Sequence, residues 1–242
     1  MPASGQRWTW IDELRAAGHR NVLEPLEPGL TQIRTEPSFA IRQQAYLVQA
    51  PDGNVLWDCI SYLDDETIAA VRELGGIRTI AVSHPHFYSS CVEWAHAFDA
   101  TVWLPSADSR WVMRPDVSIR HFDEDEVALA EGVRVVRIGG HFHGSTVLSW
   151  SAGAQGRGVL LTGDSIATVG DPGSVTVMYS YPNRIPLSAA EVRDVAKRVL
   201  ALPFDRLYAG WDGDVIGSGA HEAVERSLER YARMAEGTWV RS

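Results

Sequence analysis

The sequence predicts an α/β (α+β) fold of the four-layer αββα type, in which two β-sheets pack face to face and helices cover their outer faces. Short apolar runs rich in β-branched residues recur along the chain and fall into two blocks. Helix-like amphipathic segments close each block, and this succession favours two sheets with helices outside. With 242 residues and 45% hydrophobic content, the chain can form a core that needs no disulfide staples.

The first block of strands lies in the N-terminal half. Asp52 and Gly53 separate two apolar runs and are a strong hairpin signal. Asp64 or Asp65 is expected to cap a helix that Gly75 ends. The expected strands cover residues 30–34, 40–49, 55–58, 80–82 and 102–104, and the expected helices cover 65–74, 90–98 and 107–113.

The second block lies in the C-terminal half. Ser188 and Glu191 form a capping-box pattern, and the helix behind them carries a valine stripe that must lie on a sheet. The expected strands are a hairpin over 127–138 and the runs 159–161 and 204–209, and the expected helices cover 188–200 and 220–234.

The N-terminus is expected to form a helical arm on a single domain that spans residues 1–242. Residues 8–17 predict a short amphipathic helix with Trp10 and Leu14 on one face. Pro25, Pro28 and Gly29 behind it are typical of a linker. The arm therefore covers residues 1–29 in this prediction.

Composition narrows the class of partner. The net charge of −9 argues against a nucleic-acid binder, because phosphate contacts need clustered Arg and Lys. There is no apolar stretch approaching the ~18 residues of a membrane span, and the first residues lack a secretion signal. We expect a cytoplasmic protein that acts on a small molecule, with its oligomeric state open. Cys59 and Cys91 are expected to be small buried hydrophobes.

Two histidines follow a buried strand directly. His84 and His86 come after the apolar run 80–82, and alternation along an extended chain places both rings on one side. Neutral imidazole is the commonest metal ligand among side chains. The pattern therefore predicts a metal site, although an isolated His-x-His is also compatible with surface or capping histidines.

Two later strand ends add ligands of the same kind. His141 follows Gly139 and Gly140 after an apolar run, and Asp164 ends the run 159–161. His143 is expected to point away from the site or to shuttle protons at its rim. Three strand ends therefore offer metal ligands, which favours a metal site over unrelated surface histidines.

In these segments the chain resembles the metallo-β-lactamase fold hydrolases, whose metal loop has the sequence His-x-His-x-Asp-His. The resemblance runs from about residue 45 to the C-terminal region. It implies that His84, His86 and His141 hold the first metal position and that Asp164 is the bridging aspartate. It also implies that Asp58 supports the site from behind, while turn formation or helix capping explains Asp58 equally well.

The chain departs from the family at the second metal position. The segment from His84 to Ser89 has the sequence His-Pro-His-Phe-Tyr-Ser, so Tyr88 and Ser89 stand where the family has Asp-His. No histidine occurs in 207–212, where the family places its last one. The resemblance therefore implies a divergent subgroup with one bound ion. Zinc is favoured, and iron or manganese are the alternatives.

Three imidazoles with an open fourth position imply hydrolysis by a metal-bound hydroxide, because such an ion lowers the pKa of its water to ~7. Asp164 is expected to hold or deprotonate that water, and Tyr88 to donate a hydrogen bond to the developing oxyanion. The cleaved bond is an ester, lactone, thioester, amide or phosphodiester. A non-catalytic binding or sensing protein and an iron-dependent oxidoreductase are the alternatives.

An aromatic segment follows Asp164 and is a candidate for the substrate wall. Residues 177–183 are polar and broken by a proline, which favours a loop over a core element. Tyr179 and Tyr181, together with Trp211, are expected to line the substrate pocket. Plain loop packing is the alternative.

Overall fold

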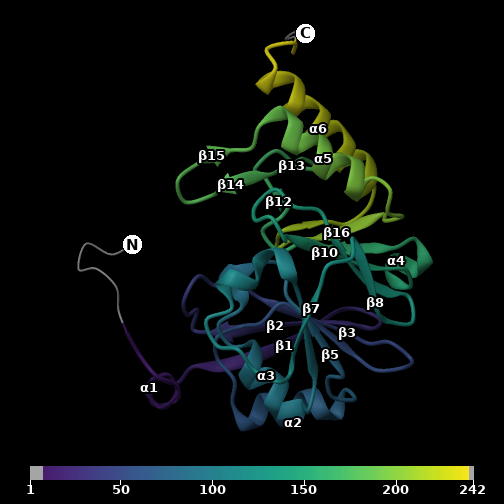
Figure 1. The fold of residues 1–242 in the computed structure, drawn as a ribbon. Helices are drawn as coiled ribbons and strands as arrows, with labels where there is room; N and C mark the ends of the chain where they lie inside the picture. Colours follow the sequence, from purple (N-terminus) through teal and green to yellow (C-terminus); the bar gives the residue numbers. More distant parts are fainter. Residues whose placement is uncertain (1–7, 240–242) are drawn as a thin grey trace.

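The computed structural model describes residues 8–239 and confirms the αββα arrangement (Figure 1). In spatial order the first sheet contains β1 (Arg20–Glu27), β2 (Leu30–Glu36), β3 (Ala45–Val48), β4 (Val55–Trp57), β5 (Thr79–Ala81), β6 (Thr101–Pro105) and β7 (Ile119–Phe122). The second sheet contains β17 (Val215–Ile216), β16 (Arg206–Tyr208), β11 (Val159–Leu161), β10 (Thr146–Trp150), β9 (Val133–Arg137) and β8 (Glu126–Ala130).

Helices cover the outer face of each sheet. The helical segments are α1 (Ile11–Ala16), α2 (Asp65–Glu73), η1 (Pro85–Phe87), α3 (Cys91–Phe98), η2 (Ser106–Trp111), α4 (Gly153–Gly156), α5 (Ala189–Val199) and α6 (Ala220–Ala235). Helices α2 and α3 lie against the first sheet, and α5 and α6 against the second. Two small hairpins, β12 (Ala167–Thr168) with β13 (Val175–Thr176) and β14 (Met178–Ser180) with β15 (Ile185–Pro186), connect the second sheet to α5.

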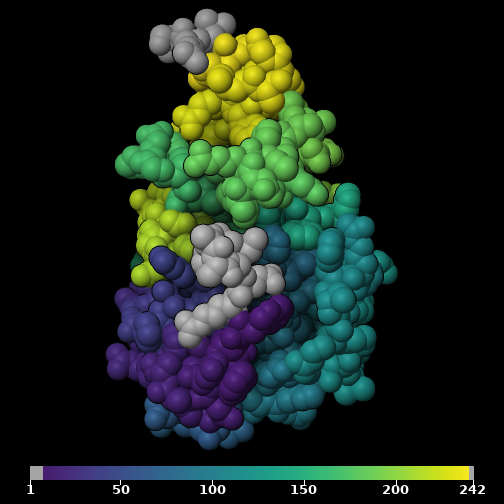
Figure 2. Space-filling model, turned by 90° about the vertical axis from the view of Figure 1, so that its left-hand side faces the viewer, coloured from purple at the N-terminus to yellow at the C-terminus, as the bar shows by residue number. Residues whose placement is uncertain are grey.

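The core is divided into three apolar layers. Leu56 packs with the residues under α2 and α3, whereas its neighbour Trp57 packs between the two sheets. In the second sheet Leu160 faces α5 and α6, and Leu161 faces the first sheet. This alternation is the period-two pattern of strands buried on both faces. Figure 2 shows the two halves of the sequence stacked, with the purple-to-teal half below the green-to-yellow half.

Both predicted helix caps are confirmed. The Asp64 carboxylate accepts a hydrogen bond from the backbone N–H of Thr67 at 2.8 Å, and α2 begins at the next residue after Asp64. At α5 the Ser188 hydroxyl and the Glu191 carboxylate form the reciprocal capping box. These bonds satisfy N–H groups that have no partner within the helix.

Strand direction brings the candidate ligands to one edge. Strands β4, β5 and β6 are parallel, so their carboxyl ends lie side by side. Strands β9 and β11 both run antiparallel to β10, so their carboxyl ends also lie together. The backbone N–H of Thr146 donates to the carbonyl of Ser83 at 2.9 Å, which joins the two sheets at this edge.

The predicted N-terminal arm is wrong in its second half. Arg20–Glu27 is not a linker but strand β1, paired antiparallel with β2. Pro25 is tolerated there because β1 is an edge strand and its register shifts between Pro25 and Glu27. Helix α1 is also shorter than predicted, and residues 1–7 of the arm lie outside the described residues.

Other boundaries differ in detail. The strand predicted over 40–49 begins only at Ala45, because Ala40 and Arg42 have left-handed backbone angles that interrupt an extended chain. The helix predicted over 107–113 is the 3₁₀ segment η2. The irregular segment predicted over 177–183 contains strand β14. No helix in the range 8–239 is long and apolar enough to span a bilayer.

A buried carboxylate fastens the edge strand β1 to the second sheet. The Glu27 side chain is 5% exposed and accepts hydrogen bonds from the Arg206 guanidinium and the Tyr208 hydroxyl, both at 2.9 Å. Its other oxygen accepts from the backbone N–H of Ala154 at 2.7 Å. Three donors, two on the second sheet and one in the α4 segment, thus bond to the Glu27 carboxylate. A buried carboxylate needs such partners, because it has lost its hydrogen bonds to water.

We expect Glu27→Ala to lower the free energy of unfolding by about 3 kcal/mol, the lower end for a broken buried ion pair, because it leaves the partly exposed Arg206 guanidinium without its counter-charge. Denaturant unfolding measures the change. The control is Glu131→Ala, which removes an exposed glutamate. Equal losses in the two variants would contradict a fastening role for Glu27.

Candidate metal centre

The first sheet supplies two histidines from the turn after β5. His84 has extended backbone angles and is fully buried, and Pro85 begins the 3₁₀ turn η1 directly behind it. The turn brings His86 back toward His84, with His84 Nε2 3.1 Å from His86 Nδ1. His86 remains exposed, so one ligand faces the core and the other faces the solvent side of the site.

The second sheet supplies His141 and Asp164. His141 Nδ1 lies 3.0 Å from the carbonyl oxygen of Met178. A carbonyl can only accept, so Nδ1 carries the proton and Nε2 is left available as a ligand. His141 Nε2 lies 3.5 Å from His86 Nδ1, and an Asp164 carboxylate oxygen lies 3.4 Å from His84 Nε2.

These four side chains fit a metal ion. Within residues 8–239 they form one group whose candidate ligand atoms all lie within 4.8 Å of one another. In a tetrahedral zinc site with bonds of 2.0–2.1 Å, neighbouring nitrogens stand about 3.3 Å apart. The distances of 3.1 Å between His84 and His86 and 3.5 Å between His141 and His86 bracket that value. The second oxygen of Asp164 is buried and has no hydrogen-bond partner among the described residues.

Burial favours the neutral form of the imidazoles, which is the form that binds a metal ion. Burial lowers the pKa of His84 well below its ordinary value, with a further contribution from His86. Burial and the neighbouring His84 lower the pKa of His141 to about 4. Burial raises the pKa of Asp164 to about 7, against the opposing effect of the histidines. Neutral rings beside a carboxyl group are a donor set that a divalent cation stabilises.

Asp58 lies behind this group. It is fully buried at the end of β4, and its carboxylate accepts from the backbone N–H of Ser83 at 2.7 Å. The Ser83 hydroxyl lies 2.9 Å from His84 Nδ1. Asp58 therefore orients His84 through Ser83, which leaves Nε2 directed at the other ligands. Burial raises the pKa of Asp58 to about 8, and the bonds from Ser83 oppose this shift.

Tyr88 is buried behind the histidine turn. Its ring packs in the core beneath α3, and its hydroxyl has no hydrogen-bond partner among residues 8–239. Burial, followed by the charge of Asp108, raises the pKa of the phenol above its ordinary value. Tyr88 does not line the pocket that contains His86 and His141, so the structure leaves its predicted role in catalysis untested.

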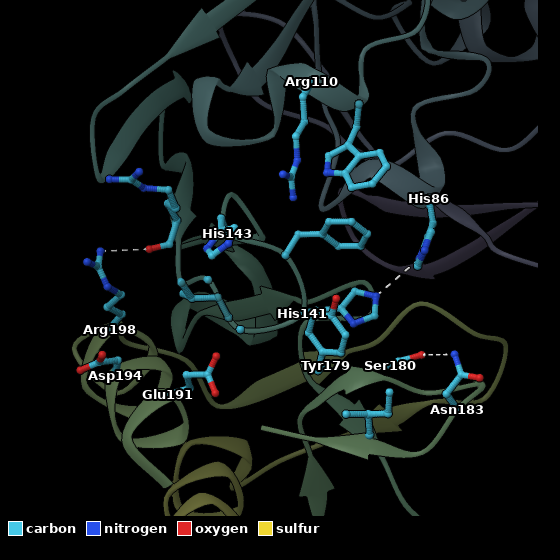
Figure 3. A pocket seen from close by; sticks show the side chains of 17 residues that line it. His86, Arg110, His141, His143, Tyr179, Ser180, Asn183, Glu191, Asp194 and Arg198 are labelled. Carbon is cyan, nitrogen blue, oxygen red and sulfur yellow. Dashed lines mark hydrogen bonds between the residues drawn. The ribbon is translucent and has the colours of Figure 1, made fainter. Parts of the chain in front are cut away.

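A pocket of about 610 Å³ opens beside the histidines (Figure 3). Of the two tyrosines expected to line the pocket, Tyr179 does so and Tyr181 does not; the ring of Tyr181 packs against His141 at 5.6 Å. Trp211 lies elsewhere, with its ring 6.3 Å from Phe87 and its indole N–H on the carbonyl of Ile41. Trp211 therefore does not line this pocket.

The sequence did not indicate several residues of the pocket. His143 lines it, which agrees with the rim position that the sequence left open and not with a ring that points away. The η2 residues Arg110 and Trp111 and the neighbouring Phe142 also line it. Their contribution depends on η2 packing against the His141 loop, which no local pattern encodes. Cys59 and Cys91 are free and buried, as expected.

The fold and this site define a metallo-β-lactamase-type domain, and the chain belongs to the metallo-beta-lactamase superfamily, whose family model matches residues 40–211. It is 46% identical over 230 residues to the uncharacterized protein YmaE of Bacillus subtilis (strain 168), covering 95% of this chain and 84% of YmaE.

Solved metallo-β-lactamases have the same fold. One is described as the first B3 metallo-β-lactamase with an active-site glutamic acid. It superposes with a TM-score of 0.60 at 17% identity and covers 96% of both chains. The Cronobacter sakazakii metallo-β-lactamase with a HARLDQ motif gives a TM-score of 0.58 at 18% identity, covering 89% of this chain and 95% of that one.

A glycine allows the two halves of the site to meet. A Cβ on Gly163 would stand 2.3 Å from Ser83 Oγ, and the backbone there has φ +53°. We expect Gly163→Ala to displace Ser83 and the adjacent His84, and to lower both metal content and stability. Elemental analysis and thermal melting measure the two effects.

The control is Gly173→Ala. Gly173 also has a left-handed φ of +69°, but no atom lies near its Cβ position. This variant should lose only about 1 kcal/mol of stability to backbone strain and keep its metal. Full metal content in Gly163→Ala would show that the close contact with Ser83 is unimportant for the site.

Proposed function

We propose that this protein is a hydrolase that uses a single zinc ion held by His84, His86 and His141. The observation that supports this most directly is the convergence of three neutral imidazoles and one carboxyl group beside a pocket large enough for a small molecule. When bound, such an ion supplies Lewis acidity, which polarises a substrate oxygen and makes an attacking water more acidic.

Asp164 is the proposed general base. Its carboxyl group contacts His84 through one oxygen, while the other oxygen has no partner among the described residues. That second oxygen can orient a water and accept its proton. Burial raises the pKa of Asp164 to about 7 without a metal ion, and a bound cation would favour the ionised carboxylate, which is the form that accepts a proton.

The proposed substrate has an ester, lactone, thioester, amide or phosphodiester bond. Tyr88 is the proposed donor to the developing oxyanion. Its raised pKa supports this role, because it keeps the proton on the phenol at neutral pH. Tyr88 lies outside the lining of the pocket, so the role requires a substrate oxygen that reaches behind the histidine turn.

We expect the purified protein to hold one equivalent of zinc per chain after dialysis, because the group of four contains no further His, Cys, Asp or Glu for a second ion among residues 8–239. His84→Ala should lose the metal and all activity on a panel of esters, lactones and thioesters. His121→Ala, which removes an exposed histidine of β7, should keep both.

Different metal contents point to different functions. Two tightly held equivalents would contradict the single-ion site. Iron in place of zinc would favour an oxidoreductase in the same pocket. A protein without metal and without activity would favour a binding or sensing role.

We expect Tyr88→Phe to lower kcat by ~10²-fold with unchanged metal content, as the loss of one oxyanion donor does. Tyr62→Phe is the matched control, because the Tyr62 hydroxyl is also buried and without a partner among the described residues but lies outside the site. Equal kcat values for wild type and Tyr88→Phe would rule out a catalytic role for the hydroxyl.

A further inference from the structure

Arg110 is a cation of the pocket that has no carboxylate partner. It points from η2 into the pocket, on the same side as His143 (Figure 3). Its guanidinium lies 4.9 Å from the ring centroid of Trp111. None of the salt bridges within residues 8–239 involves it, whereas the other two pocket arginines are paired.

The other arginines lie in a part of the pocket where negative charge predominates. Arg137 and Arg198 both reach the same oxygen of Asp125 at 2.8 Å. Glu191 and Asp194 of α5 line the pocket beside them. Three carboxylates against two guanidinium groups disfavour an anionic ligand there, because like charges repel at short range. An anion in this pocket is therefore directed to Arg110.

The structure fixes Arg110 relative to the histidines. Asp108 of η2 is buried, and its carboxylate lies against the backbone of Gly144 in the His141 loop. A Cβ on Gly144 would stand 2.7 Å from the Asp108 carboxylate, so η2 packs directly on this loop. The Trp111 ring is 5.9 Å from that of Phe142, in an edge-to-face contact. The positive charge of Arg110 acts to lower the pKa of Asp108, against the larger effect of burial, but no salt bridge joins the two side chains.

Apolar surfaces flank the unpaired cation. Trp111 is 43% exposed and lines one side of the pocket with Phe142, while Tyr179 and Ile185 of the β14–β15 hairpin line another, with 58% and 44% exposure. Aromatic walls with one fixed polar group are typical of sites for small organic molecules. One guanidinium group matches the two oxygens of a carboxylate, whereas phosphate sites usually have more donors.

Resting on the function proposed above, we propose that the substrate carries a carboxylate that Arg110 binds, attached through an apolar segment to the bond that is cleaved. Arg110 is then the residue that determines specificity. It selects acidic acyl compounds over neutral ones of the same length, and it takes no part in the bond-breaking step.

Binding tests this proposal without depending on turnover. 4-Phenylbutanoate and its neutral isostere 4-phenylbutanamide are titrated calorimetrically into the purified holoenzyme. We expect the carboxylate to bind about tenfold more tightly than the amide, as a charge-assisted pair allows. Arg110→Gln should abolish this preference and Arg110→Lys should retain part of it. Arg120→Gln, which removes an exposed arginine outside the pocket, should leave the preference intact.

Two binding results overturn the proposal. A preference that survives in Arg110→Gln means that another group, including the metal, holds the carboxylate. Tighter binding of 3-phenylpropyl phosphate than of 4-phenylbutanoate assigns the site to phosphate instead.

Kinetics separates this proposal from the proposed function. The ratio of kcat/KM for mono-4-nitrophenyl adipate to that for 4-nitrophenyl hexanoate should exceed one and fall about tenfold in Arg110→Gln. An unchanged ratio in that variant overturns the specificity role. If the wild type hydrolyses neither ester, the hydrolase proposal loses support, while the calorimetric result still decides whether Arg110 binds carboxylates.

Discussion

The face-to-face packing of the two sheets is the constraint on which the site depends. Neither sheet holds the whole group of candidate ligands, because His84 and His86 follow a strand of the first sheet and His141 and Asp164 follow strands of the second. An apolar layer that includes Trp57 holds the sheets together. The packed interface therefore brings the two pairs of candidate ligands together, while the local turns, such as η1 between His84 and His86, set the positions within each pair.

The sequence was sufficient to predict the fold and which side chains cluster as candidate metal ligands. Short apolar runs identify buried strands such as β5 and β11 without further information. Histidine or aspartate residues directly after such runs then indicate a candidate metal site. His84, His86, His141 and Asp164 were all found in this way, and the structure brings them together. Asp58 was found by resemblance, and its contact with Ser83 supplies the physical reason.

What could not be predicted depends on contacts between distant segments. Judged from its sequence neighbours alone, Pro25 indicates a linker. The chain there is nevertheless an edge strand, because its pairing with β2 outweighs the preference of proline for irregular structure. Trp211 was expected to line the pocket, but its ring contacts Phe87 instead. Arg110 has no signature in sequence at all, because its place in the pocket is set by Asp108 contacting Gly144.

The order of the strands along the chain has a consequence for synthesis on the ribosome. The first sheet is complete at Phe122, and the second sheet begins at Glu126 and ends with Ile216. At about 5–20 residues per second, the second sheet takes on the order of 5–20 s to emerge. During that interval the apolar inner face of the first sheet, with Tyr46 and Trp57, has nothing to cover it. The nascent chain is therefore most prone to aggregate when it is half made.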